Sequence, residues 1–465
     1  MENTQIHEED QDIIEAGYKP QLQRTLGFFS SFAISFSFMS ILMGIFAGYG
    51  YVLNKSGPFG LWIWPIVGLG QLLVSLIFAE MASRIPLTGS LYNWNTKLSS
   101  PATSWLVGWF VIFAYTIAAP GIIAAMIPPL QTLWGGEFTK NIIFLIAFAI
   151  IALHFLISVY GVRLAAYLNK LAVIAELIAL VVFGVLLALV LFAKGDAHPE
   201  LFTTIPATPI PYWPAFLAAI LLPAFTIFGF ESPSDLSEET LSAKRIVPRS
   251  IISSVIVSVV LGFLFLVVLT LSISNLGAIS SATDPISTIM SSQLGVIATE
   301  IFLICVVIAM FAVSLLNMML SSRIIFAMAR DTNFIAPTFF KKISSRQVPA
   351  NAIAIIALIE LITFYFFSGL IALYAAPVIL LFTAYLITVI NFARKSKTIS
   401  SAPTFSLGAW HWPAVILATL WLIAAIAILT IPEEFHLSAQ IAGGVTIFGL
   451  LLYGVVKKFV SSTSG

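Results

Sequence analysis

The chain has 465 residues, of which 59% are hydrophobic and 9% charged, with 22 Lys and Arg against 21 Asp and Glu. Soluble globular domains carry about 25% charged residues, so the composition predicts a polytopic membrane protein. The net charge of +1 and the scattered basic residues argue against nucleic-acid binding. Cys305 is the single cysteine, which excludes a disulfide framework within the chain.

Hydropathy, interrupted by Pro, Gly and charged residues, predicts an all-helical protein with twelve membrane-spanning helices. The apolar runs are too long and too uniformly apolar for the alternating strands of a transmembrane barrel. The predicted spans are 28–53, 59–83, 104–130, 141–160, 168–193, 212–241, 250–274, 287–322, 350–367, 370–392, 412–431 and 438–457.

The basic residues predict the topology. With the N-terminus inside, 19 of the 22 Lys and Arg fall in inner segments. Lys and Arg are retained in the cytoplasm during insertion, so both termini are predicted to be cytoplasmic and the protein to reside in the cell's inner (plasma) membrane. The predicted divisions are a tail at 1–25, five-helix sets at 26–194 and 195–400, two more helices at 401–459 and a tail at 460–465.

Two predicted spans are interrupted. The first contains the stretch MSILMG at 39–44, and the sixth contains Pro223 followed by GFESP at 229–233. Gly and Pro in either span alone are explained by a kink or by close packing. However, these spans are the first helices of two consecutive five-helix sets, where inverted-repeat transporters place paired broken helices. The sequence therefore predicts breaks in helices one and six.

Four long motifs follow one another along the chain. They are GYKP at 17–20 with RTL at 24–26 and FFSSFAISFSFMSILMG at 28–44, AEMASRIPLTGSLYNW at 79–94, FGFESPSDLSEET at 228–240, and SSRIIFAMARD at 321–331. In this order they resemble the amino acid–polyamine–organocation superfamily, specifically its amino acid/choline transporter branch. The resemblance implies a LeuT-type five-plus-five inverted repeat with two peripheral helices. It also implies that the protein imports or exchanges amino acids or related amines by alternating access.

Acidic residues within the spans are candidate functional groups, because an ionised side chain in mid-bilayer costs several kcal/mol. Glu231 lies directly after the predicted break in helix six. Arginine–agmatine antiporters of the superfamily have a similar Gly-x-Glu-Ser break with a gating aromatic six residues earlier, which falls on Phe225. The resemblance implies that Glu231 meets a substrate ammonium or titrates during transport. Alternatively, it caps the amides of the break. The substrate site implied here comprises Phe225, Gly229, Phe230, Glu231 and Ser232.

The break in helix one would expose backbone amides that attract a substrate carboxylate. The resemblance assigns this anchor to Leu42, Met43 and Gly44, with Ser40 just before them. Only the second glycine of the family's usual Gly-x-Gly pattern is present, which leaves room for a substrate without a carboxylate. Alternatively, Leu42 and Met43 only pack in the core, and the anchor lies elsewhere.

Glu176 lies in the middle of the predicted fifth span. Cationic amino acid transporters of the superfamily have a lysine at what looks like this position, where its ammonium replaces a sodium ion. Desolvation penalises the charged form of a carboxylate, so we predict that Glu176 is the proton-coupling residue. Sodium coordination with hydroxyls such as that of Ser314, and a neutral structural glutamate, remain open alternatives.

Other polar residues are less informative. Glu80 and Arg84, at i and i+4, suit a local ion pair or an inner gate. His154 is interpreted as a packed histidine. Glu300 and Glu360 have neither a break nor a role from the resemblance, so they stay unassigned.

No phosphate loop, nucleophile elbow or metal-ligand spacing is present, so we expect neither an enzyme nor a metal or cofactor. The coupling ion is predicted to be H⁺, with Na⁺ open. The substrate is predicted to be an amino acid, 4-aminobutyrate or a polyamine. We expect the protein to be a monomer or weak homodimer in the bilayer. A receptor that binds amino acids without moving them is the second hypothesis, although the short tails argue against it.

Overall fold

The computed structural model describes residues 14, 24–205, 211–366, 369–395 and 403–463. Their regular structure is helical apart from one parallel bridge between Leu26 and Thr240, so the prediction of an all-helical chain is confirmed for the described residues. The motif at 17–20 and most of the predicted tail at 1–25 lie outside this range, whereas α21 continues to Thr463, into the predicted tail at 460–465.

The first predicted five-helix set contains five long helical segments and a short connecting helix. Helix one is divided into α2 and α3, and the fifth segment continues through a π-helical stretch, η2, which joins α9 to α10. In chain order the elements are α2 (Phe28–Met39), α3 (Ile41–Ser56), η1 (Pro58–Trp62), α4 (Ile63–Arg84), α5 (Ser90–Leu98), α6 (Pro101–Ala125), α7 (Ile127–Trp134), α8 (Lys140–Tyr160), α9 (Val162–Leu177), η2 (Ile178–Phe183) and α10 (Gly184–Lys194).

The second set begins with the other divided helix. Its elements, with those of the last two helices, are η3 (Pro199–Thr203), α11 (Tyr212–Ala218), α12 (Leu221–Thr226), η4 (Ser232–Glu239), α13 (Ala243–Leu271), α14 (Leu276–Ser281), α15 (Pro285–Leu294), α16 (Val296–Arg330), α17 (Pro337–Phe340), α18 (Ala350–Phe366), α19 (Leu370–Lys395), η6 (Gly408–Trp410), α20 (His411–Ile428), η7 (Glu433–Phe435) and α21 (His436–Thr463).

Within the described residues, ten helices are long and apolar enough to cross a membrane. Two shorter apolar helices, Tyr212–Thr226 and Ala350–Phe366, lie at the sixth and ninth predicted spans. Because these two are shorter than a full crossing, the twelve crossings and the inverted repeat stay predictions. The predicted start of the eighth span, at residue 287, was wrong. Gly295, at φ +84°, ends α15 and starts a separate long helix, α16.

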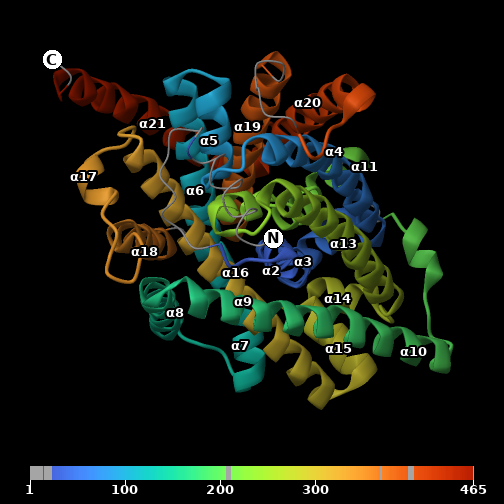
Figure 1. Ribbon diagram of the computed structural model, residues 1–465. Helices are drawn as coiled ribbons and strands as arrows, with labels where there is room; N and C mark the ends of the chain where they lie inside the picture. The colour runs from blue at the N-terminus through green and yellow to red at the C-terminus, as the bar shows by residue number, and fades with distance from the viewer. Residues whose placement is uncertain (1–13, 15–23, 206–210, 367–368, 396–402, 464–465) are drawn as a thin grey trace, which may run out of the picture.

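Helices α2 and α3 lie near the centre of the molecule, and α20 and α21 lie at its edge (Figure 1). Helix α6 packs against α16 and α19, and α13 packs against α4 and α2. The C-terminal half of helix one, α3, and the N-terminal half of helix six, α12, approach closely, since a Cβ added at Gly44 would lie 1.9 Å from Thr226 Oγ1. Backbone hydrogen bonds join the start of helix one to the end of helix six, from Thr25 N to Glu239 O at 2.9 Å and from Leu241 N to Leu26 O at 2.9 Å.

Candidate functional site: the two helix breaks

The break in helix one is a single residue. Ser40 has a left-handed backbone, with φ 34° and ψ 82°, and separates α2 from α3. The amide of Ser40 still donates to Phe36 O, and the Gly44 amide donates to Ser40 O at 3.0 Å. The amides between them belong to the first turn of α3, which lacks intrahelical acceptors. The break therefore leaves backbone donors of α3 without acceptors in their own helix.

One of these donors is already paired with a carboxylate. The Leu42 amide donates a 3.1 Å hydrogen bond to Glu176 Oε1, and both residues are buried. Glu176 comes from α9, and 134 positions separate the two residues. The partly positive N-terminus of a helix favours a negative group. The structure thus brings the predicted carboxylate anchor and the predicted proton-coupling residue together.

The break in helix six is longer. Helix α12 ends at Thr226, Gly229 has φ +73°, and η4 begins at Ser232. A side chain cannot replace the hydrogen at Gly229, because an added Cβ would lie 2.1 Å from the ring of Phe38. Glu231, at the end of this break, is fully buried.

Two tyrosines hold the Glu231 carboxylate. Tyr115 Oη on α6 donates to Oε1 at 2.7 Å, and Tyr385 Oη on α19 donates to Oε2. The Tyr385 hydroxyl also accepts a 2.8 Å hydrogen bond from the Gly229 amide. Glu231 is therefore bound to the helices that surround the break, and the break is bound to Tyr385.

Aromatic rings pack between this carboxylate and an apolar cavity on the predicted outer side. The Phe225 ring lies 4.6 Å from that of Tyr374 and 5.4 Å from that of Phe228, and Phe38 lies 4.7 Å from Tyr115, measured between centroids. We call the space above them the outer cavity. It has a volume of about 160 Å³ and is lined by Gly44, Ala47, Gly48, Tyr51, Leu221, Leu222, Phe225, Leu370, Ile371 and Tyr374.

Comparisons with known proteins identify the family. A family model described as amino acid permease matches residues 26–455. The chain belongs to the amino acid permease family. This assignment confirms the resemblance to the amino acid–polyamine–organocation superfamily. It makes the chain a transporter and not an enzyme, and it supports amino acid transport across a membrane.

Three relatives of this permease illustrate the family. The amino-acid permease BAT1 of Arabidopsis thaliana is 26% identical over 92% of this chain and 89% of its own length. The BAT1 homolog of Oryza sativa is 25% identical over 90% of this chain and 87% of its own length. The branched-chain amino acid permease BcaP of Lactococcus lactis is 23% identical over 73% of this chain and 76% of its own length.

The remaining predicted site residues of the permease are buried at the breaks. Leu42 and Met43 are in the core, and the Ser232 hydroxyl has no hydrogen-bond partner among the described residues. The Phe230 carbonyl accepts a 3.0 Å hydrogen bond from Ser35 Oγ on α2. The Ser314 hydroxyl, suggested for sodium, donates to Met310 O in its own helix at 2.9 Å.

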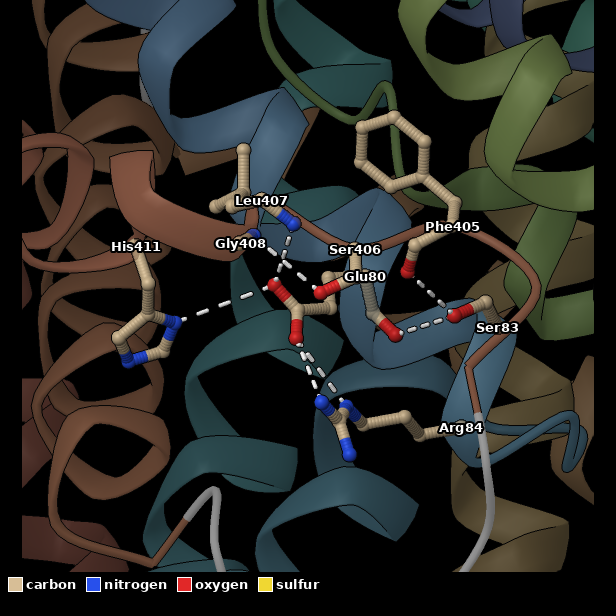
Figure 2. A network of polar contacts seen from close by, with 8 residues as sticks. All are labelled: Glu80, Ser83, Arg84, Phe405, Ser406, Leu407, Gly408 and His411. Carbon is tan, nitrogen blue, oxygen red and sulfur yellow. Dashed lines mark hydrogen bonds and ion pairs between the residues drawn. The ribbon is translucent and has the colours of Figure 1, made fainter.

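Glu80 and Arg84 form a network at the predicted inner end of α4 (Figure 2). Arg84 Nη2 donates to Glu80 Oε1 at 2.7 Å, and the Leu407 amide donates to Oε2 at 3.1 Å. His411 Nδ1 lies 3.9 Å from the same Oε2, and Ser83 Oγ donates to Phe405 O at 3.1 Å. This network joins α4 to the segment before α20.

A second cavity lies on the predicted inner side of the permease. We call this space, of about 490 Å³, the inner cavity. Four charged residues of its lining, Glu239, Arg323, Arg330 and Arg346, come from η4, α16 and the segment before α18. Arg346 also packs 4.3 Å from the centroid of the Tyr160 ring.

Sequence reasoning missed Tyr115, Tyr385 and Asp235. The tyrosines lie in long apolar runs, where only their hydroxyl groups distinguish them from core phenylalanines. Asp235 had a signal, since it is an acid within the predicted sixth span, four residues after Glu231. It is fully buried, and neither carboxylate oxygen has a hydrogen-bond partner among the described residues.

The two acids left unassigned differ in burial. Glu300 is exposed on α16, whereas Glu360 on α18 is fully buried and its oxygens have no partner among the described residues. His154 is buried, with its ring 4.4 Å from that of Phe311. No group of three or more His, Cys, Asp or Glu in the described part of the chain is arranged to hold a metal ion.

Proposed function

We propose that this permease is a secondary active transporter that moves amino acids across the cell membrane by alternating access, driven by protons. The observation that carries the proposal is the buried Glu231, at a helix break and held by hydroxyls from two other helices. An intramembrane carboxylate is costly, so its retention indicates a role in binding or ion movement.

The two breaks suit the two ends of an α-amino acid. Glu231 offers a negative group to the substrate ammonium, and the α3 amides offer donors to its carboxylate. Ser40, Leu42, Met43 and Gly44 form the carboxylate side of this proposed site, while Gly229, Phe230 and Ser232 flank Glu231. Phe225 is the proposed gate, because its ring packs with Tyr374 below the outer cavity.

Glu176 is the proposed proton-coupling residue. Its hydrogen bond to the Leu42 amide occupies a donor that the substrate carboxylate needs. Protonation would remove the negative charge that the helix terminus attracts and so release the amide to the substrate. A sodium-coupled variant of the same transporter is the alternative.

The outer cavity favours substrates with apolar side chains. Its lining is aliphatic and aromatic apart from the hydroxyls of Tyr51 and Tyr374. The name of the Lactococcus lactis relative agrees with such a substrate. We therefore rank apolar α-amino acids first and place 4-aminobutyrate and polyamines after them.

Uptake into proteoliposomes tests the function. Radiolabelled amino acids, 4-aminobutyrate and a polyamine are supplied one at a time, with an inward proton gradient, a sodium gradient or neither. We expect concentrative uptake of an apolar amino acid with the proton gradient alone. Uptake that requires sodium would show that the coupling ion is Na⁺ and not H⁺. Saturable binding without flux in every condition would show that the protein is a receptor.

A further inference from the structure

Segment η4 carries several polar side chains that are buried and lack hydrogen-bond partners among the described residues. They belong to Ser232, Ser234, Asp235 and Ser237. Buried polar groups in proteins almost always pair with protein atoms or with water. A run of such groups along one segment therefore indicates a hydrated path through the interior.

Of the three acids on η4, Asp235 is the one without a hydrogen-bond partner or ion pair among the described residues, since Glu238 accepts from the Thr88 amide and Glu239 lies near Arg323. The nearby Ser90 hydroxyl on α5, Glu231 and Arg323 act on its carboxyl group, and Asp235 in turn acts electrostatically on Tyr115 and Tyr385. Four helices, α2, α5, α13 and α16, pack against η4.

The other ionisable residues on these four helices are exposed, half-buried or close to a partner other than Asp235. Helix α2 has no ionisable residue. On α5, Tyr92 donates to Asp331 and Lys97 is exposed. Lys244, Arg245 and Arg249 on α13 are half-buried or exposed. On α16, Glu300 is exposed, Cys305 is half-buried, and Arg330 Nη1 lies 3.8 Å from Glu238 Oε2.

The C-terminal end of η4 reaches the inner cavity, because Glu239 is part of its lining. Arg323 Nε lies 3.7 Å from Glu239 Oε1, and both residues line that cavity. Asp235 therefore lies on η4 between Glu231, directly before the segment, and Glu239 at its end.

We propose that Asp235 relays protons between Glu231 and the inner cavity, through water held by the serines of η4. This inference rests on the proposed proton-coupled transport. When a substrate ammonium reaches Glu231, it favours the ionised carboxylate, and the carboxyl proton leaves. The O–H bond on Glu231 breaks as one forms on Asp235, which then gives the proton to water in the inner cavity. Arg323 favours the return of Asp235 to its anionic form.

The test compares D235N with E360Q in proteoliposomes that contain a trapped pH-sensitive dye. Glu360 is the matched control, because it is equally buried and unpartnered but α18 lies outside the set of helices packed on η4. The substrate is an equimolar mixture of the common amino acids. Proton flux, net uptake and binding are measured on the same preparations, and so is exchange between internal and external amino acids.

We expect D235N to bind and exchange amino acids as the wild type does, with proton flux and net uptake about a hundredfold slower. E360Q should match the wild type in all four measurements. Wild-type proton flux in D235N would overturn the relay and leave the transporter intact, whereas no amino acid flux in the wild type would overturn the transporter itself.

If D235N does not fold, the D235E variant tests the proton relay instead. It keeps the titratable group and moves it by one methylene. A relay predicts proton-coupled uptake with a shifted pH profile, and an unshifted profile with wild-type rates would overturn the inference.

Discussion

The two helix breaks expose different kinds of polar group. The break at Ser40 is one residue long and presents backbone amides, one of which donates a hydrogen bond to Glu176 on another helix. The break that ends at Glu231 is longer and contains the carboxyl group of Glu231, which accepts hydrogen bonds from the hydroxyls of Tyr115 and Tyr385. The first break presents hydrogen-bond donors to a carboxyl group, and the second presents a carboxyl group to hydrogen-bond donors.

This difference gives the site a polarity that matches an α-amino acid. A zwitterion can replace both internal partners, since its carboxylate suits the α3 amides and its ammonium suits Glu231. Before substrate arrives, each break is paired with a group of the protein itself, so the Leu42 amide and the Glu231 carboxyl group are not left as unpaired buried polar groups. Substitutions at the two breaks should therefore have separable effects on binding and on coupling.

The largest effect is expected for E231Q. Hydrogen bonds to charged groups contribute about 1.5–3 kcal/mol, and about 1.4 kcal/mol corresponds to a tenfold change in affinity. We expect amino acid binding and uptake to fall by about a hundredfold. Equilibrium binding and initial uptake rates measure this. E300Q, which removes an exposed acid, is the control, and equal losses in both variants would contradict a specific role for Glu231.

The E176Q variant should separate coupling from binding. The glutamine carbonyl can still accept from the Leu42 amide, but it cannot take up a proton. We expect amino acids to bind and exchange, while a proton gradient no longer drives their accumulation. Uptake measured across a pH series checks this, and a pH profile identical to that of the wild type would exclude the proton role.

Smaller effects are expected at the two tyrosines. Y385F removes hydrogen bonds to Glu231 and to the Gly229 amide, whereas Y115F removes only one. An unmade buried hydrogen bond costs about 1–3 kcal/mol, so uptake should fall about tenfold in Y385F and less in Y115F. Y365F, at an exposed tyrosine, is the control. A larger loss of uptake in Y115F than in Y385F would contradict the expectation that Tyr385 contributes more to the site.

The smallest effect on transport is expected for E80A, which lies outside both breaks. The change leaves the Leu407 amide and Arg84 without their acceptor, so the free energy of unfolding should fall by about 1–3 kcal/mol. Thermal unfolding in detergent measures this loss. Uptake per folded molecule should stay at the wild-type level, and a change in its rate would support the inner gate instead.

Local sequence patterns predicted much of the helical architecture. Apolar runs of sufficient length indicated the long helices, and Gly and Pro within two of them indicated the breaks, because both signals lie within a few residues. The eighth span was misplaced, since Gly295 continues an apolar run while its backbone turns the chain. Asp235 was overlooked although an acid within a span is itself such a signal.

The sequence by itself determined a helical membrane protein with acids at Glu176 and Glu231 and breaks near Ser40 and Gly229. Only the tertiary structure decided what those groups touch. Tyr115 and Tyr385 are 116 and 154 positions from Glu231, and Glu176 is 134 positions from Leu42. Hydropathy reports how a residue meets lipid or water, whereas hydrogen-bond partners depend on which helices pack together and how each is rotated.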